Sequence, residues 1–175
     1  MGRFIAILAS GLLLAACASP PREAAHPAGA SVSTGGLAQM IAAQRPLQCV
    51  PHARALSGLA IRGDAWTWWP AAEGRYLRGA TPRAGSVLVL MRTDRLRRGH
   101  LAVVTRVLGP RKVLAEHANW LNRGMIHRNV PLVDVSPTND WSQVRLWYVP
   151  GNHLGSRAYP AHGFIHPVTL AATSN

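Results

Sequence analysis

The stretch GSVLVLMRTDRLRRGHLAVVTRVL, residues 85–108, decides the fold class of this 175-residue chain. It contains two apolar runs, residues 86–91 and 101–108, separated by a charged loop at 93–98. Short runs rich in Val and Leu and bounded by turn residues are typical of buried β-strands. The stretch therefore predicts two adjacent antiparallel strands joined by the charged loop.

Further elements follow from the same patterns on both sides of this stretch. Toward the C-terminus, strands are predicted at residues 112–118, 125–135 and 143–149. Toward the N-terminus, short helices are predicted at residues 37–45, from about Cys49 to near Gly58, and at residues 65–69. Because helices come first and antiparallel strands follow, the chain is predicted to be α+β, with short N-terminal helices packed on an antiparallel sheet.

The second predicted helix begins at a cysteine. Pro51 suits its first turn, because the N–H that proline lacks has no helical partner there. A thiol at this position feels the positive end of the helix dipole, which lowers its pKa and favours the thiolate. Cys49 is therefore a candidate nucleophile. The alternative is that Cys49 serves as a small buried apolar residue.

The first 16 residues are predicted to be an export signal. Arg3 supplies a positive start, and the apolar run that follows is shorter than the roughly 20 residues that a membrane-spanning helix needs. The run ends in LAAC at residues 14–17, which resembles the lipobox of bacterial lipoproteins. The resemblance implies cleavage before Cys17 and lipid on its sulfur. Because Ala18, and not an aspartate, follows Cys17, we expect the protein in the outer membrane. The alternative is an ordinary secretory signal.

Composition divides the rest of the chain into three parts. Residues 17–36 comprise the lipidated cysteine and a segment rich in Ala, Pro, Gly, Ser and Thr, which is predicted to be a flexible tether. Residues 37–150 form the predicted domain, and residues 151–175 a Gly-, Pro- and His-rich C-terminal tail. If Cys17 carries lipid, Cys49 has no disulfide partner in an oxidising compartment, which favours a reactive or a buried thiol.

Charge limits the expected partners. The chain has 19 basic and 7 acidic residues and a formal net charge of +12, which attracts polyanions such as anionic lipid, cell-wall carboxylates or nucleic acid. No nucleic-acid-binding motif is present, so nucleic acid is not an expected partner. The sequence contains neither HExxH nor a CxxC pair, and no metal or other cofactor is predicted. Weak metal binding by the histidines at 153, 162 and 166 is a lesser alternative.

Candidate partners for the thiol lie on the predicted strands. His100 opens the run at 101–108, and His117 and Asn119 stand at the end of the next strand. Adjacent antiparallel strands bring the start of one beside the end of the next, where a base and a group that fixes its tautomer can meet the thiol. Strand alternation puts His117 and Asn119 on one face and Glu116 on the other. Spacing from His100 does not decide between His117 and Glu116.

Four segments together resemble the CHAP domain, the family of cysteine- and histidine-dependent amidohydrolases/peptidases related to the NlpC-type and papain-like peptidases. The segments are QC at 48–49, GSVLV at 85–89, GHLAVV at 99–104 and EHANW at 116–120. The resemblance covers roughly residues 37–150. It implies a papain-like version of the predicted α+β fold.

The resemblance also implies an activity, the hydrolysis of amide bonds in peptidoglycan. By position, Cys49 would be the nucleophile and His100 the general base. The family often has Glu-x-Asn at the third position, where this chain has His117-x-Asn119, and NlpC-type relatives use a histidine there. We expect His117 to be the third residue, with Glu116 as the alternative.

Three further residues are expected to support the reaction or to bind substrate. The Gln48 side chain would help the backbone N–H groups at the helix start to hold the oxyanion. Asn119 would support His117, and Trp120 would cover the site or pack in the core. His52, one helical turn after Cys49, would tune the thiol.

The sequence thus predicts a lipid-anchored, monomeric peptidoglycan hydrolase on the periplasmic face of a bacterial membrane. Two alternatives remain open at this point. The first is a non-catalytic wall-binding or scaffold lipoprotein that keeps the fold. The second is a hydrolase of soluble amides, since some CHAP relatives act on them.

Overall fold

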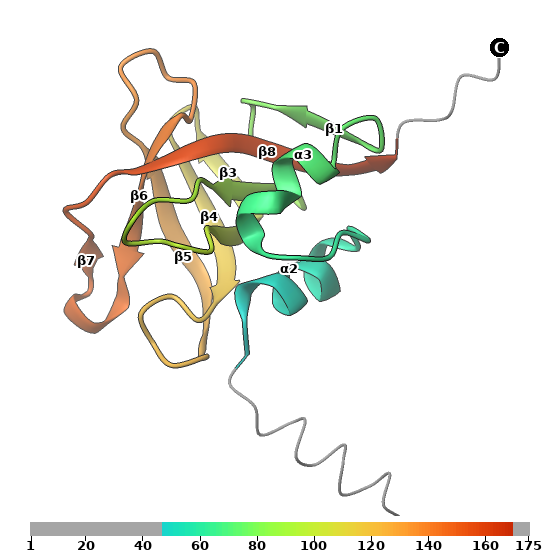
Figure 1. Ribbon diagram of the computed structural model, residues 1–175. Helices are drawn as coiled ribbons and strands as arrows, with labels where there is room; N and C mark the ends of the chain where they lie inside the picture. The colour runs from blue at the N-terminus through green and yellow to red at the C-terminus, as the bar shows by residue number, and fades with distance from the viewer. Residues whose placement is uncertain (1–46, 170–175) are drawn as a thin grey trace, which may run out of the picture. The chain divides into compact units, whose positions relative to one another are not determined.

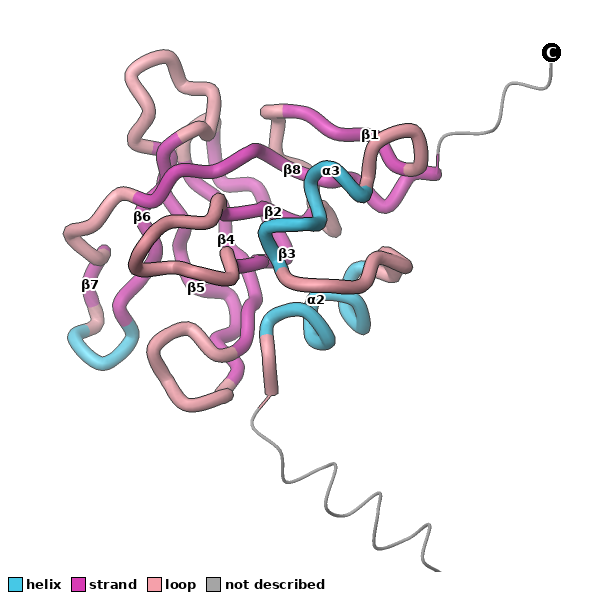
Figure 2. Tube along the Cα trace, viewed as in Figure 1, coloured by secondary structure: helices cyan, strands magenta, loops and turns pink. Residues whose placement is uncertain are grey.

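The computed structural model describes residues 47–169, and Figures 1 and 2 show that strands dominate this part of the chain. Its helical elements are α2 (Cys49–Ser57), η1 (Ala65–Thr67), α3 (Trp68–Ala71) and η2 (Val149–Gly151). Its strands are β1 (Tyr76–Gly79), β2 (Val87–Leu90), β3 (His100–Gly109), β4 (Lys112–Ala118), β5 (Ile126–Asp134), β6 (Gln143–Tyr148), β7 (His153–Leu154) and β8 (Tyr159–Thr169). The predicted leader, the tether and the helix at 37–45 lie outside the described residues.

All of the strands that the sequence predicted are present at or close to their expected positions, and β4 has the predicted bounds. The strands pair antiparallel in the order β1-β8-β2-β3-β4-β5-β6-β7. An additional pairing of β6 with β8 joins the two ends of the run from β8 to β6. Six strands therefore close into an antiparallel barrel.

The prediction of a papain-like α+β fold is wrong. The described chain is mostly β, and its only α-helices are the short α2 and α3. The cause lies in residues 151–175, expected to be a tail, because they contribute the 11-residue strand β8. β8 pairs with β2 and β1 along most of its length and with β6 at Tyr159 and Pro160, which closes the sheet on itself.

Two apolar layers account for the burial of the strands. Side chains that alternate along one face fill the barrel, among them Leu88, Leu90, Ala102, Val104 and Leu132. On the opposite face of β2 and β3, Val87, Val89, Leu101 and Val103 pack outward against α2, η1 and α3. The buried residues of these helices include Ala53 of α2 and Trp68 of α3. β2 and the first half of β3 are buried on both faces, which explains their unbroken apolar sequence.

Helix α2 begins and ends where its sequence predicts. Gln48 has an extended backbone, and its carbonyl accepts the first helical hydrogen bond from the His52 N–H at 3.2 Å. Gly58 ends the helix with φ 75°, a left-handed conformation that favours glycine. No helix within residues 47–169 is long and apolar enough to cross a membrane.

Candidate active site

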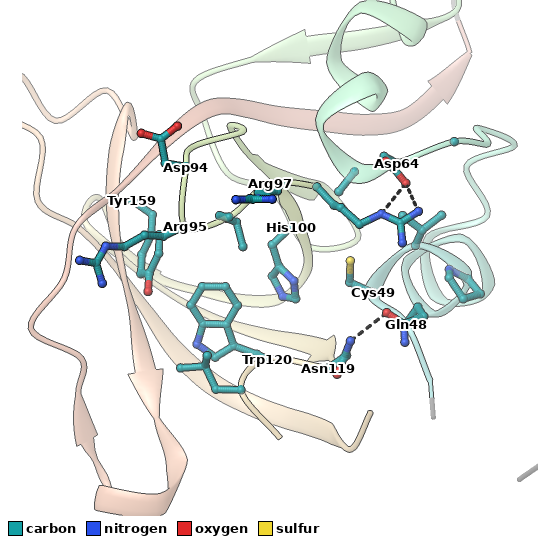
Figure 3. Close-up of a pocket in the computed structure, with 18 of the residues that line it drawn as sticks. Gln48, Cys49, Asp64, Asp94, Arg95, Arg97, His100, Asn119, Trp120 and Tyr159 are labelled. Carbon is teal, nitrogen blue, oxygen red and sulfur yellow. Dashed lines mark hydrogen bonds and ion pairs between the residues drawn. The ribbon is translucent and has the colours of Figure 1, made fainter. Parts of the chain in front are cut away.

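A cleft of about 1050 Å³ opens where α2 meets the barrel (Figure 3). Cys49, at the first position of α2, lines this cleft together with His100, at the first position of β3. The thiol is half-buried and is not part of a disulfide. In Figure 3, Cys49 and His100 lie next to each other, so the cleft brings together the predicted nucleophile and the predicted base.

The backbone before His100 fixes the position of its ring. Gly99 has φ 66°, and a Cβ atom there would lie 2.8 Å from the Leu90 carbonyl oxygen and 2.8 Å from the Trp66 nitrogen. No side chain fits at that spacing, so glycine is required for the chain to turn into β3. His100 then pairs with Leu90 in the ladder, and its side chain belongs to the barrel face.

His117 is the side chain that contacts the His100 ring by a hydrogen bond. His100 Nε2 lies 2.8 Å from His117 Nδ1, and both rings are buried. This bond occupies Nε2, so Nδ1 is the ring nitrogen of His100 left to accept a proton from the thiol. That requires the tautomer in which His100 Nε2–H donates to His117 Nδ1.

Glu116, the alternative third residue, lies on the other face of β4. Its Oε1 is 3.2 Å from His52 Nε2, and its Oε2 is 3.6 Å from Arg128 Nε. Glu116 therefore links β4 to α2 and makes no hydrogen bond or ion pair with His100. His52, expected to tune the thiol, has this carboxylate as its charged partner.

Gln48 and Asn119 are joined across the mouth of the cleft. The Asn119 side-chain N–H donates to Gln48 Oε1 at 2.8 Å, and Figure 3 shows this bond beside Cys49. Asn119 thus orients Gln48, whereas the sequence predicted that it would support His117. The bond to Oε1 fixes the orientation of the Gln48 amide, whose N–H₂ group can donate to a ligand.

Trp120 packs against both imidazoles. Its ring centroid lies 4.7 Å from that of His100 and 6.0 Å from that of His117. The indole is 6% exposed and makes an edge contact with Tyr159 at 5.0 Å. Trp120 therefore separates the histidine pair from solvent while it also lines the cleft.

A third histidine, His127, belongs to this cluster and was not among the predicted site residues. His127 of β5 pairs with His117 in the ladder, and their ring centroids are 5.5 Å apart in an edge-to-face arrangement. His127 Nε2 lies 3.0 Å from Asn122 Nδ2, in the loop between β4 and β5. The predicted hairpin of residues 112–118 and 125–135 could have located His127. The face of β5 on which His127 lies also depends on a register irregularity in the β4–β5 pairing, between Ala115 and His117.

Burial determines the electrostatics of these histidines. Desolvation lowers the pKa of His100 to about 3, and the neighbouring His127 adds to the decrease. Burial, together with His100, His127 and His52, also lowers the pKa of His117 well below its ordinary value. The histidine pair is therefore neutral near pH 7, which is the state in which His100 can accept a proton.

The predicted decrease in the pKa of Cys49 is not observed. Burial raises the pKa of the thiol, and this effect outweighs the backbone N–H groups of Leu101, Val50 and Cys49 and the charge of Arg98, which lower it. The backbone N–H groups at the helix start lower the pKa of Cys49, as predicted, but desolvation raises it by more. In the unliganded site both the thiol and His100 are therefore neutral.

No group of three or more metal-binding side chains gathers within residues 47–169. The histidines at 153, 162 and 166, considered as a weak metal set, do not converge: His162 stacks on Trp69, His153 contacts Tyr148, and His166 lies near Gly79.

A thiol at a helix start, a histidine beside it and a second side chain hydrogen-bonded to that histidine form the arrangement that nucleophilic cysteine catalysis requires. Residues 41–119 match the family model of the CHAP domain, which supports the presence of a CHAP domain in this part of the chain. The matched segment includes Cys49, His100, His117 and Asn119 and ends before β5. CHAP domains are in general hydrolytic amidases or peptidases that act on peptidoglycan. No curated protein matches the chain.

Proposed function

We propose that this protein is a cysteine hydrolase that cleaves an amide bond of peptidoglycan, with Cys49 as nucleophile, His100 as general base and His117 as the residue that orients His100. The observation that carries the proposal is the 2.8 Å hydrogen bond between His100 Nε2 and His117 Nδ1, beside a thiol that lines the same cleft. It leaves His100 Nδ1 as the nitrogen available to the thiol.

In the first step the Cys49 sulfur attacks the carbonyl carbon of the scissile amide while its proton passes to His100 Nδ1. Because both groups begin neutral, proton transfer accompanies the attack and a stable thiolate–imidazolium pair is not needed beforehand. The resulting imidazolium donates from Nε2 to the neutral His117. His117 thus stabilises the charged base without adding a buried negative charge.

The oxyanion that forms on the carbonyl oxygen is held by hydrogen-bond donors at the start of α2. The backbone N–H of Cys49 belongs to the first helical turn, where N–H groups lack helical acceptors. The Gln48 amide N–H₂ group, fixed through its oxygen by Asn119, is the second donor.

The tetrahedral intermediate then collapses. The C–N bond breaks, the amine leaves with the proton from His100 Nδ1, and a thioester remains on Cys49. A water molecule attacks the thioester carbonyl, gives one proton to His100 and releases a carboxylic acid. The thiol regains the proton, so the cycle consumes one water and yields one amine and one acid.

The proposal is tested on purified cell-wall sacculi with the native protein and the Cys49→Ala variant. We expect soluble fragments and new free amines from the native protein, and release at least about 10³-fold slower from the variant. Leu56→Ala is a matched control, because Leu56 lies on the same helix and is 46% exposed. Equal release by the native protein and Cys49→Ala would contradict the proposal.

A non-catalytic scaffold is the second candidate, because burial raises the pKa of Cys49 and so reduces its reactivity in the free protein. Thiol titration with a small alkylating agent separates the two functions. A hydrolase site gives a Cys49 whose alkylation slows when His100 is replaced by Ala. A scaffold gives a thiol that resists alkylation to the same extent in both proteins.

We also propose that the protein is an outer-membrane lipoprotein held by lipid on Cys17, on the periplasmic side, and that it acts as a monomer. The support is the LAAC sequence at residues 14–17 with Ala18 after it. Growth with labelled fatty acid should label the native protein but not Cys17→Ser. Label on both proteins would contradict the anchor, whatever the enzymatic result.

A further inference from the structure

Arginines from two separate loops line the same cleft as Cys49. Arg95 and Arg97 belong to the loop between β2 and β3, and Arg157 belongs to the loop between β7 and β8. All three are exposed. We refer to these three residues as the arginine rim. In Figure 3, His100 lies between Cys49 and the end of the cleft that holds Arg95 and Tyr159, so Arg95 lies on the side of His100 away from the nucleophile.

The rim has little neutralising charge of its own. None of its arginines forms an ion pair with another residue between 47 and 169, whereas the neighbouring Arg98 is held by Asp64 at 2.7 Å. Most other carboxylates of this part of the chain are engaged elsewhere, including Glu116 with His52. Asp94 is the one remaining acidic residue of the cleft lining, so three positive charges face one negative charge.

Arg95 and Arg157 are close neighbours. Besides the main cleft, both line a small adjoining pocket with Asp94 and Tyr159, and Arg157 and Tyr159 also line a third pocket beyond Trp120. Two like charges from different loops repel each other unless an anion lies between them. Guanidinium groups match the planar geometry of a carboxylate and bind it with paired hydrogen bonds.

We infer that the arginine rim binds a free carboxylate of the substrate peptide, so that the enzyme selects amide bonds close to an unamidated acidic residue. This inference rests on the proposed function and adds a substrate class to it. In this inference the arginine rim positions the substrate peptide, and the amide bond is cleaved at the Cys49 end of the cleft. The partner is a peptide that carries carboxylates, since the arginines lie along the same cleft that would hold the scissile bond.

Two synthetic muramyl peptides test the inference, one with its side-chain and α-carboxylates free and a twin in which each carboxylate is a carboxamide. Binding is measured by calorimetry on the Cys49→Ala protein, which cannot turn the peptides over. We expect the free-carboxylate peptide to bind about tenfold or more tightly than its twin. Adding Arg95→Gln and Arg157→Gln together should remove most of that difference.

Arg106→Gln is the control for charge, because Arg106 is exposed on β3 and lies outside the cleft lining, and each of the three substitutions removes one positive charge. It should leave the preference for the carboxylate peptide unchanged. Equal binding of the two peptides, or an equal loss with Arg106→Gln, would overturn the inference. Tighter binding of inorganic polyphosphate than of the carboxylate peptide would also overturn it, because the rim would then select phosphate.

Turnover by the protein with Cys49 intact keeps the two claims separate. Cys49-dependent cleavage of both peptides at equal kcat/KM supports the hydrolase and overturns the carboxylate rim. A binding preference that depends on Arg95 and Arg157, without any cleavage, supports the rim and contradicts the hydrolase. A higher kcat/KM for the carboxylate peptide, lost in the Arg95→Gln, Arg157→Gln protein, supports both.

Discussion

The barrel interior and the outer helical layer contribute to the candidate site in different ways. The interior supplies His100 and His117 from adjacent strands, and their position follows from strand register and alternation. The outer layer supplies Cys49 from α2, which packs on β3 and β4. The positions of His100 and His117 are therefore set by the sheet, whereas the position of Cys49 depends on how the short helix α2 packs against it.

The difference also appears in the environments of the two regions. His100 and His117 are buried within the barrel face and kept neutral by desolvation. Cys49 lies at the boundary, half-buried, where helix N–H groups oppose the effect of burial. The contact between Glu116 and His52 joins the two regions on the side of β4 opposite to His117. The two faces of β4 thus serve two tasks: His117 contacts His100 on one face, and Glu116 contacts α2 on the other.

The largest effect is expected when the base is removed from the interior. His100→Ala should lower kcat/KM on wall peptides by about 10³-fold or more, because the thiol loses its proton acceptor. Its α2 layer should remain docked, since His100 belongs to the other apolar layer. Circular dichroism and steady-state kinetics check this. A variant that keeps more than a tenth of the native kcat/KM would contradict the role of His100.

Acid should destabilise the interior more than the outer layer. Unfolded histidines take up protons below their ordinary pKa of 6.5, whereas folded His100 does so only near pH 3, so stability falls as the pH drops from 6.5 toward 3. Between pH 7 and pH 5, the titration of His100 alone should lower the free energy of unfolding by on the order of 2 kcal/mol. Urea unfolding at pH 7 and pH 5 measures this.

The His100→Gln variant is the control for the acid effect. It lacks the buried imidazole, so its stability should change less between pH 7 and pH 5 than that of the native protein. The same pH dependence in both proteins would show that other groups, and not the barrel histidines, cause the loss.

The smallest effect is expected at the contact between the two regions. His52→Gln removes the partner of Glu116 Oε1, but Arg128 remains 3.6 Å from Oε2. We expect a loss of about 1 kcal/mol or less in unfolding free energy and a change in kcat/KM within about threefold. Thermal unfolding and kinetics check both numbers. A loss of activity as large as that of His100→Ala would mean that α2 docking depends on this contact.

Local patterns allowed much of the site to be predicted. The alternation in EHANW put His117 and Glu116 on opposite faces of β4, and the structure has them there. The residues around Cys49 marked the start of α2, and Gly58 marked its end. These features are determined by residues close together in the sequence, so local sequence patterns can predict them.

Features set by distant parts of the chain could not be predicted in this way. β8 is punctuated by Pro160, Gly163 and Pro167, which are typical of loops, and its pairing with β6 closes the barrel. The pKa of Cys49 depends on burial by the folded chain, which a helix-start argument does not include. The arginine rim joins loops about 60 residues apart, near Arg97 and Arg157.

In the proposed mechanism the interior histidine His117, and not the outer carboxylate of Glu116, orients the base His100. The direct test compares kcat/KM of His117→Ala and Glu116→Ala on the same wall peptide, with folding checked by circular dichroism. We predict a loss of about 100-fold for His117→Ala and of less than about fivefold for Glu116→Ala. A folded Glu116→Ala protein that loses as much as His117→Ala, or more, would contradict the account.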